Sequence, residues 1–325
     1  MKILITGGSG FIGTNLIDYY LSKGIEVANI DIAPPKINAH ESYWRKINIL
    51  DKTSLFDEVV KYSPTHIINL AATTGMNDKD KTLEDFATNI QGILNIINSA
   101  KTVSSLERII FISSMAVCRI GYQPQNETDY CPDSLYGESK MLGEKLIRQA
   151  GTLPYSWIIV RPTGIWGPWS HEAYNALFKL IQRGLYIHPA GVSINYSLGF
   201  VGNAVYQLDK LLQAPSHKIH GKSIYLADSP PIDMRVWTNL AQKTFGAPRI
   251  HEMPIWILKV MAAIGDILTI VGWKYPPLTS PRLENMLTTF VFDLNPILTE
   301  NLPYELEEAV QITVDWICNK KLSTN

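Results

Sequence analysis

The chain of 325 residues is 46% hydrophobic and 18% charged, with a formal net charge of −1. This composition is typical of a globular protein with one large domain or two unequal ones. The near-neutral charge, without any block of basic residues, argues against a nucleic-acid partner. The three cysteines form neither a CxxC motif nor an even framework, which favours reduced thiols and a cytoplasmic location.

The first half of the chain alternates between strand-like runs and helix-length segments. Strands are expected at residues 2–6, 25–32, 43–50, 66–72, 107–114 and 155–162, and helices at residues 11–24, 51–62, 83–101 and 135–151. The strand-like runs are mostly continuous Ile and Val, as expected of strands that are covered on both faces. The alternation predicts an α/β fold with a Rossmann-type doubly wound parallel sheet.

The pattern changes after residue 162. A loop is expected at residues 163–175, strand-like runs at 197–205 and 222–228, and helices at 176–184, 235–246, 255–273 and 304–321. We expect an NAD-binding Rossmann domain over residues 1–165, to which segments of about 197–227 return. Residues 166–325 would mainly form a smaller α+β substrate-binding lobe, interleaved in sequence with the first domain.

The apolar segment at residues 255–273 raises the question of a membrane span. Lys259 and Asp266 interrupt it, and both would lie in hydrocarbon if the segment crossed a bilayer. We therefore expect no transmembrane segment here, but an apolar helix of the smaller lobe. Peripheral membrane contact is the alternative interpretation.

The stretch TGGSGFIG spaces Gly7, Gly10 and Gly13 evenly between a predicted strand and a predicted helix. Glycines at such a junction permit a tight turn and the close approach of a pyrophosphate, and the helix N-terminus favours an anion. The spacing alone also fits an ordinary glycine-rich turn. Asp31, however, ends the next strand, where a carboxylate can accept hydrogen bonds from both ribose hydroxyls. Because Asp31 repels a 2′-phosphate and no arginine follows it closely, NAD is favoured over NADP.

Tyr136 and Lys140 are four residues apart and so lie on one face of a predicted helix. A free phenol has a pKa of about 10, and a nearby ammonium stabilises the phenolate. Two further YxxxK matches, at positions 19/23 and 206/210, are interpreted as solvated helix faces. The 136/140 pair begins its helix shortly after a strand that ends in Ser113 and Ser114. Ligands of open α/β sheets bind at the carboxyl ends of such strands.

The motifs TGxxGxxG, an acid after the second strand, NLAA, ISS and YxxxK occur in this order. The ordered set resembles the extended short-chain dehydrogenase/reductase family, which includes NAD-dependent sugar epimerases and dehydratases. The resemblance covers nearly the whole chain. It implies an NAD-dependent epimerase or dehydrogenase/reductase, and a homodimer that pairs the helices of residues 83–101 and 135–150.

The resemblance also implies roles for individual residues. Tyr136 would be the acid/base, Lys140 would bind the nicotinamide ribose and lower the tyrosine pKa, and Ser114 would hydrogen-bond the reacting oxygen. Asn89 would either flank the cofactor or be a buried structural amide. The remaining positions that would contact the dinucleotide are Gly7, Gly10, Phe11, Ile12, Gly13, Asp31, Ile49, Leu50, Asp51, Ala71, Ala72, Arg161 and Pro162.

The residues that follow Ser114 limit the types of reaction that the resemblance allows. The 4,6-dehydratases of the family resemble T-D-E at this point, whereas Ser114 is followed by Met115 and Ala116, which transfer no protons. Reversible hydride transfer with one tyrosine-mediated proton transfer remains, as in a 4-epimerase or a plain alcohol dehydrogenase or ketoreductase. No spacing of His, Cys, Asp or Glu predicts a metal site.

A nucleotide-activated sugar is the leading hypothesis for the substrate. Asn195 stands where many sugar-nucleotide enzymes place an arginine for the diphosphate, although other arginines could supply the charge: Arg183, Arg235 or Arg282. A lipophilic alcohol, as in the hydroxysteroid-dehydrogenase-like branch, is the alternative. A third possibility is a non-catalytic NAD-binding protein, against which the complete Ser, Tyr and Lys set argues.

Overall fold

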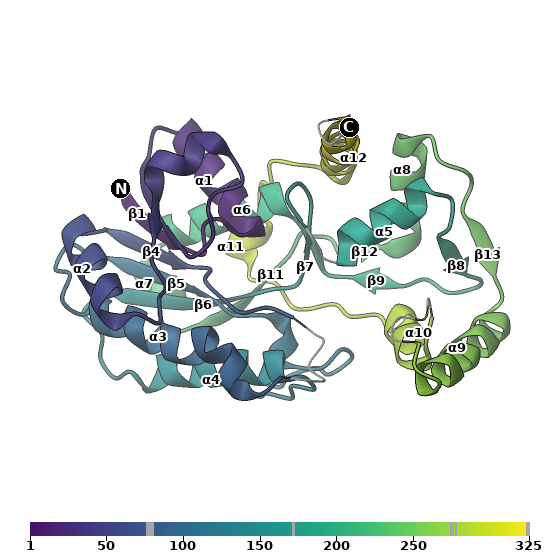
Figure 1. Cartoon of the computed structure of the whole chain (residues 1–325), viewed down its shortest axis with the longest axis horizontal. Coiled ribbons are helices and arrows are strands. Elements are labelled where there is room, and N and C mark those ends of the chain that lie inside the picture. Colours follow the sequence, from purple (N-terminus) through teal and green to yellow (C-terminus); the bar gives the residue numbers. More distant parts are fainter. Residues whose placement is uncertain (76–80, 171–172, 274–275, 277, 323–325) are drawn as a thin grey trace. The chain divides into compact units, whose positions relative to one another are not determined.

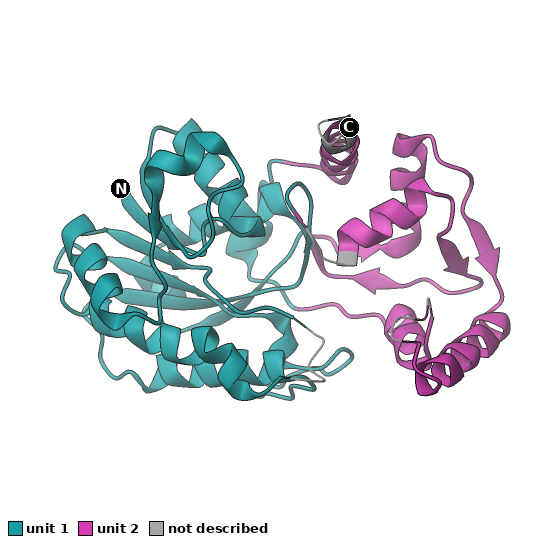
Figure 2. Ribbon diagram, viewed as in Figure 1, with its two compact units in different colours: residues 1–169, 199–228, 293–303 teal, residues 170–198, 229–292, 304–325 magenta. Residues whose placement is uncertain are grey.

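The computed structural model describes residues 1–75, 81–170, 173–273, 276 and 278–322. The chain forms two compact units, coloured teal and magenta in Figure 2. Unit 1 comprises Met1–Trp169, Gly199–Asp228 and Asp293–Pro303, and unit 2 comprises Ser170–Leu198, Ser229–Phe292 and Tyr304–Asn325. Each unit is therefore assembled from three separate stretches of the sequence.

Unit 1 is built on a seven-stranded sheet with the strand order β11-β6-β5-β4-β1-β2-β3 (Figure 1). All of its neighbouring strands run parallel. The strands are β1 (Lys2–Thr6), β2 (Glu26–Asp31), β3 (Trp44–Lys46), β4 (His66–Asn69), β5 (Arg108–Ile112), β6 (Ser156–Pro162) and β11 (Ser223–Leu226). The order reverses direction between β1 and β4, which creates a switch point at their carboxyl ends. The predicted doubly wound parallel sheet is confirmed.

Helices cover both faces of this sheet. The main ones are α1 (Phe11–Ser22), α2 (Lys52–Tyr62), α3 (Ala87–Ala100), α4 (Leu135–Gln149) and α6 (Val201–Gln213). Shorter elements connect them: η1 (Asn38–Tyr43), η2 (Leu83–Phe86), η3 (Met115–Val117), α7 (Ser216–Ile219) and α11 (Pro296–Thr299). Helices α2, α3 and α4 lie on one face, and α1 and α6 lie on the other (Figure 1).

Alternate residues of each strand enter two separate hydrophobic cores. In β1, Ile3 and Ile5 pack with α1 and α6, whereas Leu4 packs with α2, α3 and α4. The same alternation holds in β5, where Ile110 enters the first core and Ile109 the second. Because successive side chains of a strand point to opposite faces, continuous apolar runs are what a sheet covered on both sides requires.

Unit 2 combines helices with short strand pairs. Its helices are α5 (Ala173–Gln182), α8 (Met234–Phe245), α9 (Ile255–Ile270), α10 (Ser280–Leu287) and α12 (Leu306–Leu322). Its strands are β8 (Ile187–Pro189), β9 (Asn195–Tyr196), β12 (Ile232–Asp233) and β13 (His251–Met253), with β8 paired to β13 and β9 to β12. Trp237 of α8 is fully buried, in edge-to-face contact with Phe178 of α5 at 5.2 Å between ring centroids.

Three of the sequence expectations for local structure are wrong in extent. The strand expected at 197–205 is limited to β10 (Leu198–Phe200), and α6 begins at Val201. The apolar residues of α6 recur at helical spacing, at positions 201, 204, 205, 208, 211 and 212, so their helical period outweighs the local β-type composition. The strand expected at 43–50 is limited to β3, and the expected loop at 163–175 contains the short strand β7 (Gly164–Trp166), which pairs with β10.

Across the described residues, none of the helices combines the length and the apolar character that crossing a membrane requires. The apolar segment at 255–273 forms α9, a helix of 16 residues.

The YxxxK match at Tyr19 and Lys23 joins two helices. Both side chains donate hydrogen bonds to the same carboxylate oxygen of Asp209 on α6, at 2.9 Å from the tyrosine Oη and 3.0 Å from the lysine Nζ. Asp209 is buried, with 4% of its side chain exposed. The interpretation of this pair as a solvated helix face is therefore wrong, because the pair anchors α1 to α6.

Replacing Asp209 with Ala is expected to destabilise unit 1. The variant removes both of these hydrogen bonds from a buried position, which costs about 1–3 kcal/mol. The matched control is Asp57→Ala on the exposed face of α2, with an expected change of at most about 0.5 kcal/mol. The urea midpoint of unfolding, followed by circular dichroism, measures both effects. Equal midpoints for the two variants would show that the Asp209 contacts add no stability.

Candidate active site

The glycine-rich loop follows β1 at the switch point of the sheet. Gly7 has a φ of +72°, and a Cβ on it would lie 2.6 Å from the backbone nitrogen of Ala71. A Cβ on Gly13, in the first turn of α1, would lie 2.6 Å from the carbonyl oxygen of Gly7. The loop thus packs against its surroundings backbone to backbone, which leaves room for no side chain at either position. Ala71 and Ala72 follow β4 and are half-buried beside it.

Asp31 lies at the end of β2, within hydrogen-bond distance of the glycine-rich loop. One of its carboxylate oxygens accepts from the backbone N–H of Ser9 at 2.9 Å, and the other accepts from Ala33 at 2.9 Å. The Ser9 hydroxyl donates to the carbonyl of Ala33 at 2.9 Å. These contacts hold the carboxylate next to the turn that leads into α1.

The N-terminus of helix α1 is suited to binding an anion. Its N-cap is Gly10, which has no side chain to cap the helix, and the first turn contains no acidic residue. The backbone N–H groups of Phe11, Ile12 and Gly13 have no carbonyl partner within the helix, so they are oriented to bind a phosphate. Together with the carboxylate of Asp31, this arrangement fits a dinucleotide, with its pyrophosphate at α1 and a ribose at Asp31.

Ile49, Leu50 and Asp51, which are predicted to contact the dinucleotide, also make hydrogen bonds that stabilise the fold. The carboxylate of Asp51 caps α2, accepting from the backbone N–H groups of Thr53 and Ser54 at 3.2 Å. Hydrogen bonds from Ser54 lower the pKa of Asp51. The side-chain amide of Asn95 donates to the carbonyls of Ile49 at 2.9 Å and of Leu50 at 3.4 Å. The contact of these three residues with the dinucleotide stays a prediction.

Asn89 of α3 is buried, and its side-chain amide has hydrogen-bond partners within the protein; its predicted position beside the cofactor stays a prediction. Its side chain accepts from the N–H of Thr73 and donates to the carbonyl of Thr73, both at 2.9 Å. It also donates to the hydroxyl of Ser139 at 2.9 Å, and Ser139 donates to the carbonyl of Tyr136 at 2.7 Å. Asn89 thereby connects the segment after β4 to the first turn of α4.

Ser114 and Tyr136 are brought together by contact between two backbones. Ser114 caps η3, where its hydroxyl accepts from the N–H of Ala116 at 3.1 Å. A Cβ on Gly137 would lie 2.2 Å from the carbonyl oxygen of Ala116, so the first turn of α4 rests directly on η3. The capping hydroxyl of Ser134 accepts from Gly137 at 3.1 Å and starts α4 at this point.

Lys140 lies one turn further along α4 and is buried. Its Nζ donates to the carbonyl of Ile112, the last residue of β5, at 3.0 Å, and lies 5.9 Å from the centroid of the Tyr136 ring. Burial lowers the pKa of Lys140 to about 8, and the charge of Glu144 opposes this shift. The structure therefore brings Tyr136 and Lys140 together at the end of β5.

Glu144 is a residue that the sequence analysis missed. It is paired with Arg161 of β6 through two hydrogen bonds, of 2.9 Å to Nε and 2.7 Å to Nη2, and both side chains are 1% exposed. Glu144 also accepts from the hydroxyls of Ser113 at 2.5 Å and Tyr130 at 3.0 Å. Two signals were available in the sequence. Glu144 follows Lys140 by four residues on one helix face, and Arg161 directly follows the apolar run WIIV of β6.

The environment of Arg161 bears on its predicted cofactor contact. Burial alone would lower the pKa of its guanidinium, but the hydrogen bonds and charge of Glu144 raise it above its ordinary value. The guanidinium also donates to the carbonyl of Glu127 at 2.6 Å and lies over the ring of Tyr130 at 5.4 Å. Arg161 thus joins β6 to α4 and to the segment before it. Pro162 follows at the end of β6, half-buried, and the cofactor contacts of both residues stay predictions.

Comparison with known proteins was made by sequence and by structure. Residues 3–226 match the model of the NAD dependent epimerase/dehydratase family, over more than half of the chain. The chain belongs to this family. The protein is therefore an enzyme of the extended short-chain dehydrogenase type, with NAD as its cofactor, as the sequence motifs predicted.

Relatives of this epimerase-family enzyme differ in substrate. An N-acetyl-alpha-D-glucosaminyl-diphospho-ditrans,octacis-undecaprenol 4-epimerase of Escherichia coli O157:H7 is 25% identical over 335 residues, which cover 97% of this chain and 95% of the relative. A 3-beta-hydroxysteroid dehydrogenase of Mycolicibacterium neoaurum is 23% identical over 247 residues, which cover 72% of this chain and 67% of the relative. The structure of UDP-glucuronic acid 4-epimerase from Bacillus cereus in complex with UDP-glucuronic acid and NAD has a TM-score of 0.74 at 20% identity, covering 98% of this chain and 100% of that one.

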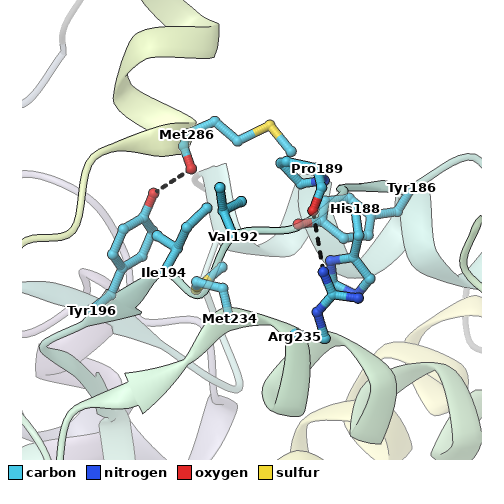
Figure 3. Close-up of a pocket in the computed structure, with 9 residues that line it drawn as sticks. All are labelled: Tyr186, His188, Pro189, Val192, Ile194, Tyr196, Met234, Arg235 and Met286. Carbon is cyan, nitrogen blue, oxygen red and sulfur yellow. Dashed lines mark hydrogen bonds between the residues drawn. The ribbon is translucent and has the colours of Figure 1, made fainter. Parts of the chain in front are cut away.

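Unit 2 of the enzyme contains a pocket that is mostly apolar (Figure 3). Arg235 is the cation among its lining residues, and it is paired with Glu252 and donates to the carbonyl of Pro189 at 3.1 Å. Burial and the charge of Arg235 lower the pKa of His188. The pocket is lined by Tyr186, His188, Pro189, Val192, Ile194, Tyr196, Met234, Arg235 and Met286.

Replacing Glu144 with Gln is expected to destabilise the enzyme by about 3 kcal/mol. The substitution leaves the guanidinium of Arg161 buried without its opposing charge, and such a loss is strongly unfavourable. Glu138→Gln is the control, because Glu138 lies half-buried on the same helix; its expected cost is below about 1 kcal/mol. Urea midpoints decide between the two outcomes, and a loss of equal size in both variants would contradict the role of the buried pair.

The buried Lys140 predicts a pH-dependent stability for the enzyme without cofactor. Its pKa falls from an ordinary value of 10.5 to about 8, so between these values the unfolded chain holds a proton that the folded chain has released. The free energy of unfolding therefore rises with pH across this window. Lys140→Met lacks this contribution. Thermal midpoints of both proteins from pH 7 to pH 10 test it, and two parallel curves would refute it.

Proposed function

We propose that the protein is an NAD-dependent oxidoreductase or epimerase that acts on a hydroxyl or keto carbon of a nucleotide-activated sugar. The observation that carries the proposal is the position of Lys140 beside the Tyr136 ring at the carboxyl end of β5, with Ser114 held on the adjoining turn. The UDP-glucuronic acid complex of the B. cereus neighbour supports a nucleotide-activated sugar. The E. coli relative, named for a sugar linked through diphosphate to undecaprenol, supports only the sugar-diphosphate part of the substrate.

The residues of the chain would bind the cofactor and transfer the proton of the substrate. NAD, when bound, supplies the acceptor and donor of a hydride. The amides of α1 would hold its pyrophosphate, and Asp31 would hold a ribose. The Tyr136 oxygen takes the proton from the substrate hydroxyl or returns it to the keto oxygen, while the ammonium of Lys140 favours the phenolate. The Ser114 hydroxyl hydrogen-bonds the reacting oxygen.

The neighbours of Ser114 limit the proposed reaction to hydride and single proton transfer. Met115 and Ala116 form η3 directly after Ser114 and offer no acid for the elimination of water. A 4-epimerase or a reductase needs no further group. We assign the enzyme to the cytoplasm and, from the family resemblance, to a homodimer formed through α3 and α4.

A lipophilic alcohol is the second candidate for the substrate. In unit 2, Tyr196 donates to the carbonyl of Asn285 at 2.9 Å and Arg235 is bound to Glu252, so both of these polar groups already have partners within the protein. Asn195, in place of an arginine, adds no positive charge. The 3-beta-hydroxysteroid dehydrogenase of M. neoaurum is the relative that agrees with this candidate.

Tyr136→Phe is expected to lower turnover by about 10²- to 10⁴-fold, because it removes the acid/base group. NAD affinity, measured by titration calorimetry, is expected to stay within a few-fold. Tyr206→Phe, in another YxxxK match, is the matched control and is expected to retain activity. The assay panel contains UDP- and GDP-sugars and hydroxysteroids, so the active substrate also distinguishes the two candidates. Full activity of Tyr136→Phe on that substrate would overturn the catalytic assignment.

A further inference from the structure

The exposed apolar side chains of the described residues are concentrated around one helix of unit 2. Trp256 is 68% exposed, Ile267 is 62% exposed and Ile270 is 86% exposed. Monomeric proteins rarely present apolar patches larger than a few hundred Å². The large exposed hydrophobic residues of this region are Trp256, Val260, Met261, Ile264, Ile267, Ile270, Val271 and Trp273.

Six of these side chains share one face of α9. At 100° per residue, they fall within a sector of about 120° around the helix axis. We call this face the α9 stripe. On the order of 100 Å² from each of the six side chains adds up to about 600 Å², the upper end of the largest apolar patch on a typical monomer. The stripe consists of Trp256, Val260, Ile264, Ile267, Ile270 and Val271.

The opposite face of α9 is fixed by packing. Leu258 and Ala262 are buried and form a small cluster with Leu283 of α10, and α9 and α10 lie against each other in Figure 1. A Cβ on Gly265 would lie 1.8 Å from the carbonyl oxygen of Leu278. This backbone contact sets the rotation of α9, so the helix presents its stripe outward as a permanent feature of unit 2.

The two charged residues of α9 lie outside the stripe, Lys259 at its edge and Asp266 further round the helix. Asp266 accepts hydrogen bonds from the backbone N–H of Ser280 at 3.0 Å and from its hydroxyl at 2.5 Å, so its charge is used at the start of α10. Lys259 is exposed at the edge of the stripe, where a lysine can lay its stem on apolar surface with its ammonium among lipid headgroups. Trp256 and Trp273 stand near the two ends, as tryptophans do at membrane interfaces.

We propose that the α9 stripe docks the enzyme on the surface of a phospholipid bilayer, with the helix lying in the plane of the membrane. The 16 residues of α9 are fewer than the roughly 20 residues of a spanning helix, whereas an apolar face with a lysine at its edge and tryptophans near its ends suits interfacial binding. The stripe contains no acid that anionic lipid would repel. A second copy of the chain fits less well, because two convex helices meet along a narrow seam, while lipid covers the whole sector.

The docking proposal is independent of which substrate the enzyme uses. If the substrate is the lipophilic alcohol, docking brings the enzyme to the phase that holds it, and that consequence alone rests on the proposed function. The test below therefore measures binding to lipid and no turnover.

The test is co-sedimentation of the full chain with vesicles of phosphatidylcholine, alone or mixed equally with phosphatidylglycerol. Wild type is expected to bind, and Val260→Glu/Ile267→Glu is expected to lose affinity by at least about tenfold. The control Leu185→Glu/Val236→Glu has equally exposed apolar positions outside α9, since Leu185 is 62% and Val236 is 57% exposed. It is expected to bind like wild type.

Three results would overturn the proposal. Wild type could stay in the supernatant with both kinds of vesicle, or the stripe variant could bind as well as the control. Sedimentation velocity without lipid could also show a wild-type dimer that dissociates in the stripe variant alone, and this result would assign the stripe to a second copy. NAD titration of both double variants verifies that unit 1 is intact, which separates failure of docking from failure of the proposed activity.

Discussion

A buried carboxylate organises the carboxyl edge of the parallel sheet. Glu144 reaches from α4 to Arg161 on β6 and to the hydroxyl of Ser113 beyond β5, and it stands one turn from Lys140. A charge in such a place is tolerated only when its partners are all present. The pair therefore couples the position of α4 to that of two strands, and with it the position of Tyr136 and Lys140.

The local pattern of apolar residues and glycines was enough to predict most strands and helices of unit 1 from the sequence. Continuous apolar runs marked the strands, because both faces of the sheet are covered, and the glycines marked a loop whose close contacts admit no Cβ. The start of α6 was missed because Val201 and its neighbours have β-type composition, and their helical period becomes visible only over the longer segment to Leu212. Glu144 was missed because its partners Tyr130, Arg161 and Ser113 lie on other elements, and only the packing of α4 on the sheet brings them together.

The three YxxxK matches show why a spacing alone does not define a site. Tyr19 and Lys23 share Asp209 and join two helices. In the second match, the Nζ of Lys210 donates to the carbonyl of Glu300 at 2.9 Å. Tyr136 and Lys140 lie at the end of a central strand, with the lysine buried. The same spacing thus serves three purposes, and the element that meets the helix face decides which.

The contact between Gly137 and Ala116 has a consequence for how this scaffold can change its chemistry. Helix α4 rests on the carbonyl oxygen of residue 116, and every amino acid has that oxygen. The contact that positions α4 therefore does not depend on the side chains of residues 115 and 116. Side chains that donate protons can therefore be introduced beside Ser114 while Tyr136 and Lys140 keep their positions. The reaction can change at this short turn without a change in the rest of the fold.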